Sequence, residues 1–223
     1  MKLTKFGHAC IRLDADGAGV GTIVVDPGKF TDVSAALDGA AYILVTHEHD
    51  DHVDYPKVAA AMMANPALKL WADDEVVKGL EAAGAPSHQL TTLEPGDYAQ
   101  IPGWRVRAGG GWHKPIRSNM PRFHNLTYTI SADGGTVYHP GDSLDLPYHG
   151  VDVLCVPISG PWLALGEAID YVHDAEARIA VAIHDSLNTD IGSQLWEFRL
   201  ADNALAGPTE FKRLKIGETI TVS

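Results

Sequence analysis

Residues 41–52 read AYILVTHEHDDH. The stretch opens with an apolar run, residues 41–46, that is typical of a buried β-strand, and passes directly into three histidines and three acidic residues. Functional side chains concentrate on loops that rigid strands hold in place. We therefore expect a fold in which strands deliver polar clusters to the ends of β-sheets.

The spacing of these polar residues suits two adjacent metal ions. Alternate residues of an extended backbone point to the same side, so His47 and His49 can reach one ion, and the turn that follows presents Asp51 and His52 to a second. Imidazole and carboxylate groups are ligands of zinc, manganese and iron. A solvated, histidine-rich loop without catalytic metal is the alternative, which the strand before the cluster disfavours.

Such ions need more ligands than one loop supplies, and three later residues are candidates. His113 follows a glycine run, Asp142 follows a predicted strand, and His184 follows the apolar stretch 179–183. His124 is the competitor of His113.

Two further polar residues at strand ends, His8 and Asp26, are candidates for orienting a ligand imidazole. A purely structural turn is an equal alternative for Asp26, because Asp often precedes Pro-Gly in turns.

Strand and helix patterns alternate along the rest of the chain, twice over and without a Pro- or Ser-rich linker. We expect a single α/β domain over residues 1–223, an αββα sandwich of two mixed β-sheets packed face to face with helices outside. Strands are predicted over 2–6, 9–13, 20–25, 69–71, 88–93, 104–108, 125–130, 136–138, 151–157, 179–183 and within 211–222. Helices are predicted over 32–37, 54–64, 73–84 and 165–172, with a final helix whose apolar face carries Ile191, Leu195, Phe198 and Leu205.

Composition narrows the functional classes. The formal net charge of −12 disfavours tight binding to nucleic acid, which depends mainly on Lys and Arg. Neither an apolar leader nor an 18-residue apolar span is visible, so no membrane association is expected. The two cysteines, Cys10 and Cys155, lie in apolar surroundings and fit reduced thiols in the cytoplasm. Assembly into a homo-oligomer stays open.

The chain resembles the metallo-β-lactamase superfamily, whose His-x-His-x-Asp-His motif is matched at residues 47–52 and whose later His, Asp and His are matched at His113, Asp142 and His184. The turn at 25–28, the segment 138–142 and the stretch 161–171 are similar to small bacterial hydrolases related to ascorbate-phosphate lactonase. This resemblance covers essentially the whole chain and implies the same sandwich fold.

The resemblance also implies a ligand set. His47, His49 and His113 would surround one divalent ion, Asp51, His52 and His184 the other, and Asp142 would bridge both. Zinc is the expected metal, with Mn²⁺ or Fe²⁺ as alternatives. Asp142 stands where some true β-lactamases carry a cysteine ligand, which makes antibiotic hydrolysis a poor expectation.

The expected activity is hydrolysis by a metal-bound hydroxide, with Asp51 or Asp142 moving the proton to the leaving group. A small anionic ester, lactone or phosphodiester is the expected substrate, since Lys114, Arg117 and Arg122 follow His113. A solvated basic loop is the alternative for these three cations. An iron-dependent sulfur dioxygenase or another redox protein on the same fold is the alternative function, and a non-catalytic metal-binding module is a third.

Overall fold

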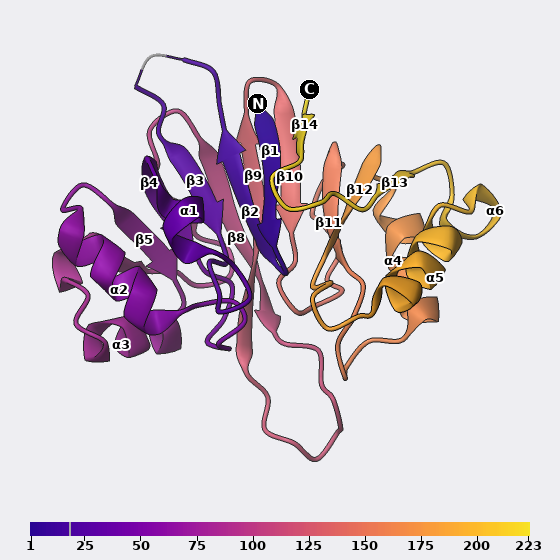
Figure 1. Ribbon diagram of the computed structural model, residues 1–223, viewed down its shortest axis with the longest axis horizontal. Coiled ribbons are helices and arrows are strands. Elements are labelled where there is room, and N and C mark those ends of the chain that lie inside the picture. The colour runs from indigo at the N-terminus through magenta and orange to yellow at the C-terminus, as the bar shows by residue number, and fades with distance from the viewer. Residues whose placement is uncertain (18) are drawn as a thin grey trace.

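Two seven-stranded sheets pack face to face in the computed structural model, which describes residues 1–17 and 19–223 (Figure 1). The first sheet has the strand order β14-β1-β2-β3-β4-β5-β6 and the second the order β13-β12-β11-β10-β9-β8-β7. Both mix parallel and antiparallel pairs: β3 to β6 and β10 to β13 run parallel, and the remaining neighbours antiparallel.

The strands of the first sheet are β1 (Lys2–Gly7), β2 (Cys10–Asp14), β3 (Thr22–Val25), β4 (Ala40–Leu44), β5 (Lys69–Ala72), β6 (Leu90–Thr92) and β14 (Thr219–Thr221). Those of the second are β7 (Tyr98–Ala99), β8 (Arg105–Trp112), β9 (His124–Ala132), β10 (Gly135–His139), β11 (Val153–Pro157), β12 (Ile179–Ile183) and β13 (Glu210–Lys212). The helices are α1 (Val33–Leu37), α2 (Tyr55–Ala64), α3 (Asp74–Ala82), α4 (Leu165–Ala175), α5 (Asp190–Leu200) and α6 (Asn203–Ala206), with a 3₁₀ turn, η1, at Ser87–Gln89.

Three apolar clusters hold these layers together. The central one lies between the sheets and includes Leu44 from one sheet and Tyr128 from the other. A second lies between the first sheet and α1 to α3, and a third between the second sheet and α4 to α6. Helices thus cover the outer faces of both sheets (Figure 1), and the predicted αββα sandwich is confirmed.

The final helix differs from its prediction. Ile191, Leu195, Phe198 and Leu205 do not form a buried face, because they are 80, 53, 66 and 41 % exposed. Within α5, Ser193 and Leu200 are the buried residues and Trp196 is partly buried, so the helix packs through the side that carries these three residues.

Two strand predictions were also inexact. Residues 87–89 form η1 and only 90–92 a strand, because the buried Gln89 amide donates to the carbonyls of Asn65 and Leu68 and so fixes a turn there. Strand β8 continues through three glycines to Trp112, because β9 pairs with it along its whole length. Within the described residues, no helix is long and apolar enough to cross a membrane.

Candidate metal centre

The histidine-rich loop leaves the end of β4 and runs to the start of α2. Its first part is anchored to the opposite sheet, because the Tyr128 hydroxyl donates to the Val45 carbonyl at 2.8 Å. A turn follows in which the His52 N–H donates to the His49 carbonyl at 2.9 Å. The Asp54 side chain then caps α2, accepting from the Lys57 N–H as its position before the helix predicts. The loop is therefore fixed at both ends.

Two glycines allow the neighbouring turns to pack against this loop. A side chain at Gly28 would overlap the backbone of Asp51, since an added Cβ would lie 1.9 Å from the Asp51 carbonyl oxygen. Gly141 adopts a φ of +58°, and a Cβ there would lie 2.4 Å from the Asn125 side chain and 2.8 Å from that of Thr46. The close approach of these turns brings Asp142 up to the loop.

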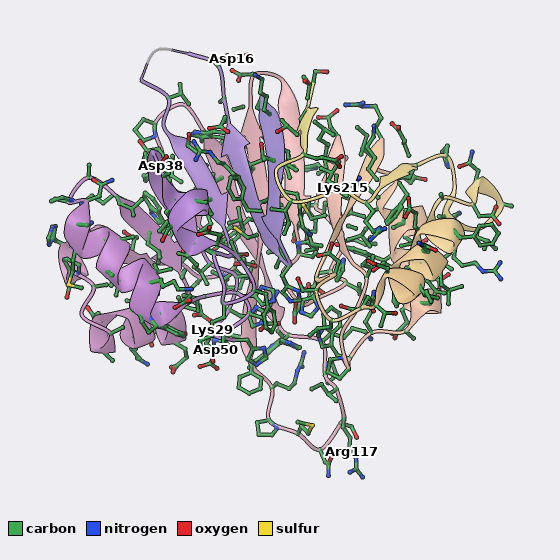
Figure 2. The ribbon with its side chains drawn as sticks, in the orientation of Figure 1. Asp16, Lys29, Asp38, Asp50, Arg117 and Lys215 are labelled. Atoms are coloured by element: carbon green, nitrogen blue, oxygen red, sulfur yellow. The ribbon has the colours of Figure 1, made fainter. Side chains whose placement is uncertain are left out.

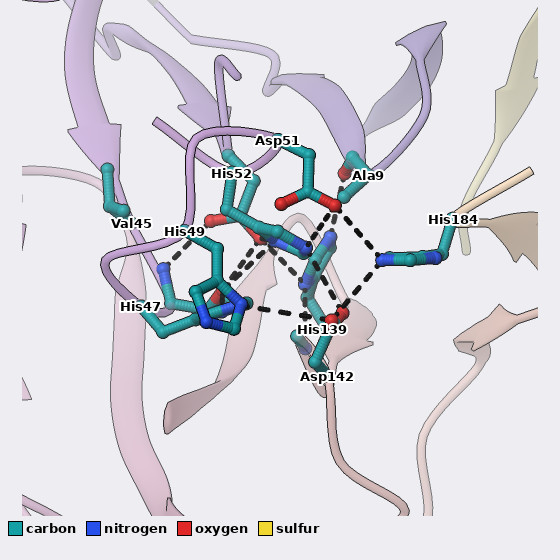
Figure 3. A network of polar contacts seen from close by, with 12 residues as sticks. Ala9, Val45, His47, His49, Asp51, His52, His139, Asp142 and His184 are labelled. Carbon is teal, nitrogen blue, oxygen red and sulfur yellow. Dashed lines mark hydrogen bonds and ion pairs between the residues drawn. The ribbon is translucent and has the colours of Figure 1, made fainter. Parts of the chain in front are cut away.

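Asp142 follows β10 and lies near side chains from the loops that follow β4, β8 and β12. Figure 3 shows His47, His52 and His184 around it. Its carboxylate oxygens lie 3.1 Å from His52 Nε2, 3.2 Å from His113 Nε2 and 3.2 Å from His184 Nε2. His47 Nε2 is 3.9 Å away. One buried carboxylate thus faces four imidazoles from both halves of the chain.

The ligand-type atoms fall into two groups of four, and within each group all of them lie within 4.8 Å of one another. The first, here called the His47 group, contains His47, His49, His113 and Asp142. The second, the His52 group, contains His8, Asp51, His52 and His184. All seven residues expected as ligands are therefore brought together, with His8 in addition.

His124 takes no part in either group. Its ring packs edge-on against Trp112 at 4.7 Å, on the surface at the start of β9. Of the two histidines that competed from sequence, the structure brings His113 into the cluster.

The donor set fits divalent metal ions. Four buried side-chain atoms have no hydrogen-bond partner within the described residues: His52 Nε2, Asp142 Oδ1 and both ring nitrogens of His184. Buried polar atoms without partners are rare in folded proteins. Nitrogen and oxygen atoms that lie close together without hydrogen-bond geometry resemble the ligand atoms of a shared cation. The cluster consists only of His and Asp, which suits zinc, manganese or iron.

Asp26 orients one of these imidazoles. It is fully buried, with one oxygen accepting from the Thr46 N–H at 2.8 Å and the other lying 2.7 Å from His52 Nδ1. His52 Nδ1 therefore donates to Asp26, and Nε2 is free to face Asp142. Of the two interpretations open for Asp26, the structure supports the orienting one.

His8 is held equally firmly. Its Nδ1 accepts from the Ser186 N–H at 3.3 Å, so the other nitrogen, Nε2, carries the proton and faces Asp51 Oδ2 at 3.1 Å. The His8 carbonyl accepts from the His184 N–H at 3.0 Å. His8 thus contacts one ligand-type residue through its ring and another through its backbone.

Lys5 and Asn125 are the site residues that sequence reasoning missed. The buried Lys5 ammonium donates to the carbonyls of His8 and Ala182 and to Asp185, at 2.6, 3.0 and 3.0 Å. Asn125 accepts from the Asp142 N–H at 2.9 Å. A signal for Lys5 existed, because the period of two along β1 places it on the buried face beside Leu3.

The electrostatics of the cluster favour a bound cation. Burial opposes ionisation of Asp142, but the imidazoles of His52 and His184 outweigh it and hold the pKa of this carboxyl well below its usual range. Burial, together with the neighbouring imidazoles of His52, His49 and His113, lowers the pKa of His47 well below its usual value, which favours the neutral imidazole that binds metal. Burial raises the pKa of Cys155 to about 12, which excludes a thiolate nucleophile there.

Backbone strain concentrates at this edge of the sheets. Among the described residues, five other than glycine have a positive φ, and three of these lie at the site: His8 at 42°, Asp26 at 49° and His184 at 54°. Such conformations persist only where the surroundings enforce them, and they cluster at functional sites.

Comparisons with known proteins agree with this geometry. Residues 2–184 match a family model described as the beta-lactamase superfamily domain. Protein Rv0786c of Mycobacterium tuberculosis is 34 % identical over 189 residues, which cover 84 % of this chain and 85 % of that protein. A protein of Methanoculleus marisnigri named UPF0173 metal-dependent hydrolase is 28 % identical, over 89 % of this chain and 87 % of its own.

Solved structures show the same fold. Igni18 of Ignicoccus hospitalis, described as a novel metallo hydrolase, aligns with a TM-score of 0.73 at 21 % identity, over 98 % of this chain and 97 % of that one. CmlA of Streptomyces venezuelae, a diiron beta-hydroxylase, aligns with a TM-score of 0.72 at 14 % identity, over 99 % of this chain and 54 % of its own. The family match and the 34 % identical relative show that this chain belongs to the metallo-β-lactamase superfamily, among relatives that include its metal-dependent hydrolases.

Proposed function

We propose that this hydrolase works with two divalent metal ions, zinc first, with Mn²⁺ or Fe²⁺ as the alternatives. His47, His49 and His113 would hold one ion, Asp51, His52 and His184 the other, and Asp142 would bridge them. The observation that carries this proposal is the placement of Asp142, whose two oxygens face imidazoles of both groups within 3.9 Å. Each ion would have three side chains of its own and share Asp142 with the other, so an ion that expands to five positions keeps one for water or substrate.

Two such ions, when bound, would supply a water activated for attack at neutral pH and would polarise the substrate oxygen. The two carboxylates then differ in what they can do. The Asp142 side chain is 3 % exposed, and the Asp142 backbone N–H donates to the Asn125 side-chain oxygen at 2.9 Å, so this residue is fixed in place. The Asp51 side chain is 23 % exposed and lies beside the protonated Nε2 of His8. We therefore assign the movement of the proton to the leaving group to Asp51.

The proposed substrate is a small ester, lactone or phosphodiester that carries an anionic group. Lys114 is an unsuitable partner for that group, because its ammonium lies 2.7 Å from Glu167. Arg117 lies at the tip of the β8–β9 loop, away from the cluster (Figure 2). Arg122 stacks over Trp112 at 4.9 Å and has no carboxylate within 4.0 Å among the described residues, so it is the cation that supports an anionic substrate. The finer likeness to ascorbate-phosphate lactonase stays a prediction.

Purified protein loaded with Zn²⁺, Mn²⁺ or Fe²⁺ and assayed on ester, lactone and phosphodiester panels tests this function. We expect close to two ions per chain by elemental analysis and hydrolysis of at least one class. A stoichiometry persistently below one ion in folded protein contradicts the two-metal site. Oxygen consumption by the iron-loaded protein, without hydrolysis, would favour the redox alternative.

A further inference from the structure

The loop between β8 and β9, residues 113–123, extends below the body of the molecule (Figure 1), and Arg117 lies at its tip (Figure 2). It carries three apolar side chains that are open to solvent: Ile116, 49 % exposed, Met120, 45 %, and Phe123, 36 %. Apolar side chains gathered on one exposed loop commonly mark a binding surface.

This apolar surface begins at the His47 group. A cavity of about 80 Å³ is lined by Ile116, Met120 and Phe123 together with His49 and His113. The Phe123 ring meets the His49 ring edge-on, with 4.6 Å between their centroids. Any substrate bound over this group therefore has an apolar wall beside it.

The loop that lines the cavity is braced at both of its roots. Pro115 and Pro121 restrict the backbone on either side of the tip, since proline fixes φ. The Lys114 N–H donates to the Asp142 carbonyl at 2.8 Å, and the His113 N–H donates to the Phe123 carbonyl at 3.0 Å. Both roots of the loop are thus tied to the cluster itself.

The two cationic side chains that line the cavity both have other partners. Lys114 lines it, but Glu167 neutralises its ammonium. Arg122 also lines it, and its guanidinium lies over the Trp112 ring. The rest of the lining is mainly carbon. Burying an apolar group against such a lining is favourable, whereas burying a charged group there is not.

We propose that this cavity binds a short apolar substituent next to the scissile bond of the substrate. Its volume corresponds to roughly three groups of the size of water, at about 30 Å³ each, so it covers about three non-hydrogen atoms, and the rest of a longer chain would extend into solvent. The inference rests on the proposed function and narrows its substrate class. An anionic group, if present, belongs at the Arg122 rim and not in the cavity.

Two matched ester series test the inference, one lengthened on the acyl side and one on the alcohol side. For the side that enters the cavity, kcat/KM is expected to rise about fourfold for each methylene, hence about 15-fold from acetyl to butyryl. Hexanoyl and octanoyl esters should gain nothing further. The carboxylate or alcohol product of that series should bind the metal-loaded protein with the same chain-length preference in calorimetry.

Met120→Ser tests the position of the cavity, and Met63→Ser is its control, because Met63 is similarly exposed at 55 % but lies on α2. We expect Met120→Ser to lower the butyryl-to-acetyl ratio from about 15 to below about 5, and Met63→Ser to preserve it. Metal content is measured in both variants.

The outcomes separate the two proposals. If no ester, lactone or phosphodiester is hydrolysed by protein that holds its metal, the proposed function fails. If esters are hydrolysed but neither series depends on chain length, or Met120→Ser leaves the ratio unchanged, only the apolar cavity is overturned. If Met120→Ser changes the oligomeric mass and leaves the butyryl-to-acetyl ratio unchanged, the loop serves self-association, and the proposed apolar cavity is overturned as well.

Discussion

The His47 group and the His52 group offer similar ligand atoms but differ in their surroundings. In the His52 group, His52 is tied to Asp26, and His8 to Ser186 and, through its carbonyl, to Lys5. The His47 group instead opens through His49 and His113 onto the apolar cavity. Both groups have buried polar support, since His47 Nδ1 lies 3.0 Å from Thr46 Oγ1, but the His47 group also borders the apolar cavity. We infer that substitutions behind the His52 group alter metal retention, and those beside the His47 group alter specificity.

The largest effect is expected from Asp142→Asn, which acts on both groups at once. The amide loses the charge with which one carboxylate can bridge two cations, so activity should fall by more than about 100-fold and the metal content below two ions per chain. Elemental analysis and kinetics measure both quantities. Asp152→Asn is the control, because Asp152 only accepts the Thr136 N–H at 2.8 Å, which an amide oxygen also does. Equal metal content and activity in Asp142→Asn and the parent would exclude the bridging role.

Asp26→Asn should weaken the His52 group alone. The NH₂ group of the new amide would face His52 Nδ1 or Thr46, which already donate to Asp26, so two donors would face each other. Metal affinity should fall about 10- to 100-fold for one of the two ions, as for other partners of ligand histidines. Titration with a chelator measures this loss. Asp32→Asn is the control and should behave like the parent, since Asn caps a helix such as α1 as well as Asp does. If Asp26→Asn loses its metal at the same chelator concentration as the parent, the orienting role is refuted.

Lys5→Met should lower the free energy of unfolding by about 1–3 kcal/mol, because two buried carbonyls and the part-buried Asp185 carboxylate lose their donor. It should also release one ion at a lower chelator concentration. Denaturant unfolding and chelator titration provide the two measurements. Lys2→Met, on the exposed face of the same strand, should change neither.

A separate control distinguishes positioning from simple destabilisation in Lys5→Met. Leu80→Ala removes a buried side chain of α3 from the apolar cluster between the first sheet and its helices. It should lower the free energy of unfolding by about 2–5 kcal/mol. If Leu80→Ala releases metal as readily as Lys5→Met does, Lys5 contributes stability only.

The smallest effect is expected at the rim of the cavity. Arg122→Ala should lower kcat/KM for an anionic substrate analogue about two- to fivefold, the range for an exposed cation, and leave a neutral analogue unaffected. Arg105→Ala is the matched control, because Arg105 lies near the Tyr98 ring, 5.8 Å from its centroid, at the other end of β8. Equal losses on both analogues would remove the support for an anionic substrate.

The sequence by itself determined the layers and the core of the centre. Apolar periodicity is local, so it predicted most strands and helices. The four expected ligands His47, His49, Asp51 and His52 lie within six consecutive residues, so one loop carries them all. The later ligands were predictable as residues at strand ends, because parallel strands end at one edge of a sheet. The single domain, the cytoplasmic location and the identity of the metal remain predictions.

Only the tertiary structure decided which distant residues meet. It separated His113 from His124, gave Asp26 a partner in His52, and paired Lys114 with Glu167, 53 positions away, so that a cation expected to bind substrate is already neutralised. It also left the apolar side of α5 exposed and placed Lys5 behind His8. Each of these depends on contacts between segments far apart in the chain, and no local pattern encodes the distance between two such segments.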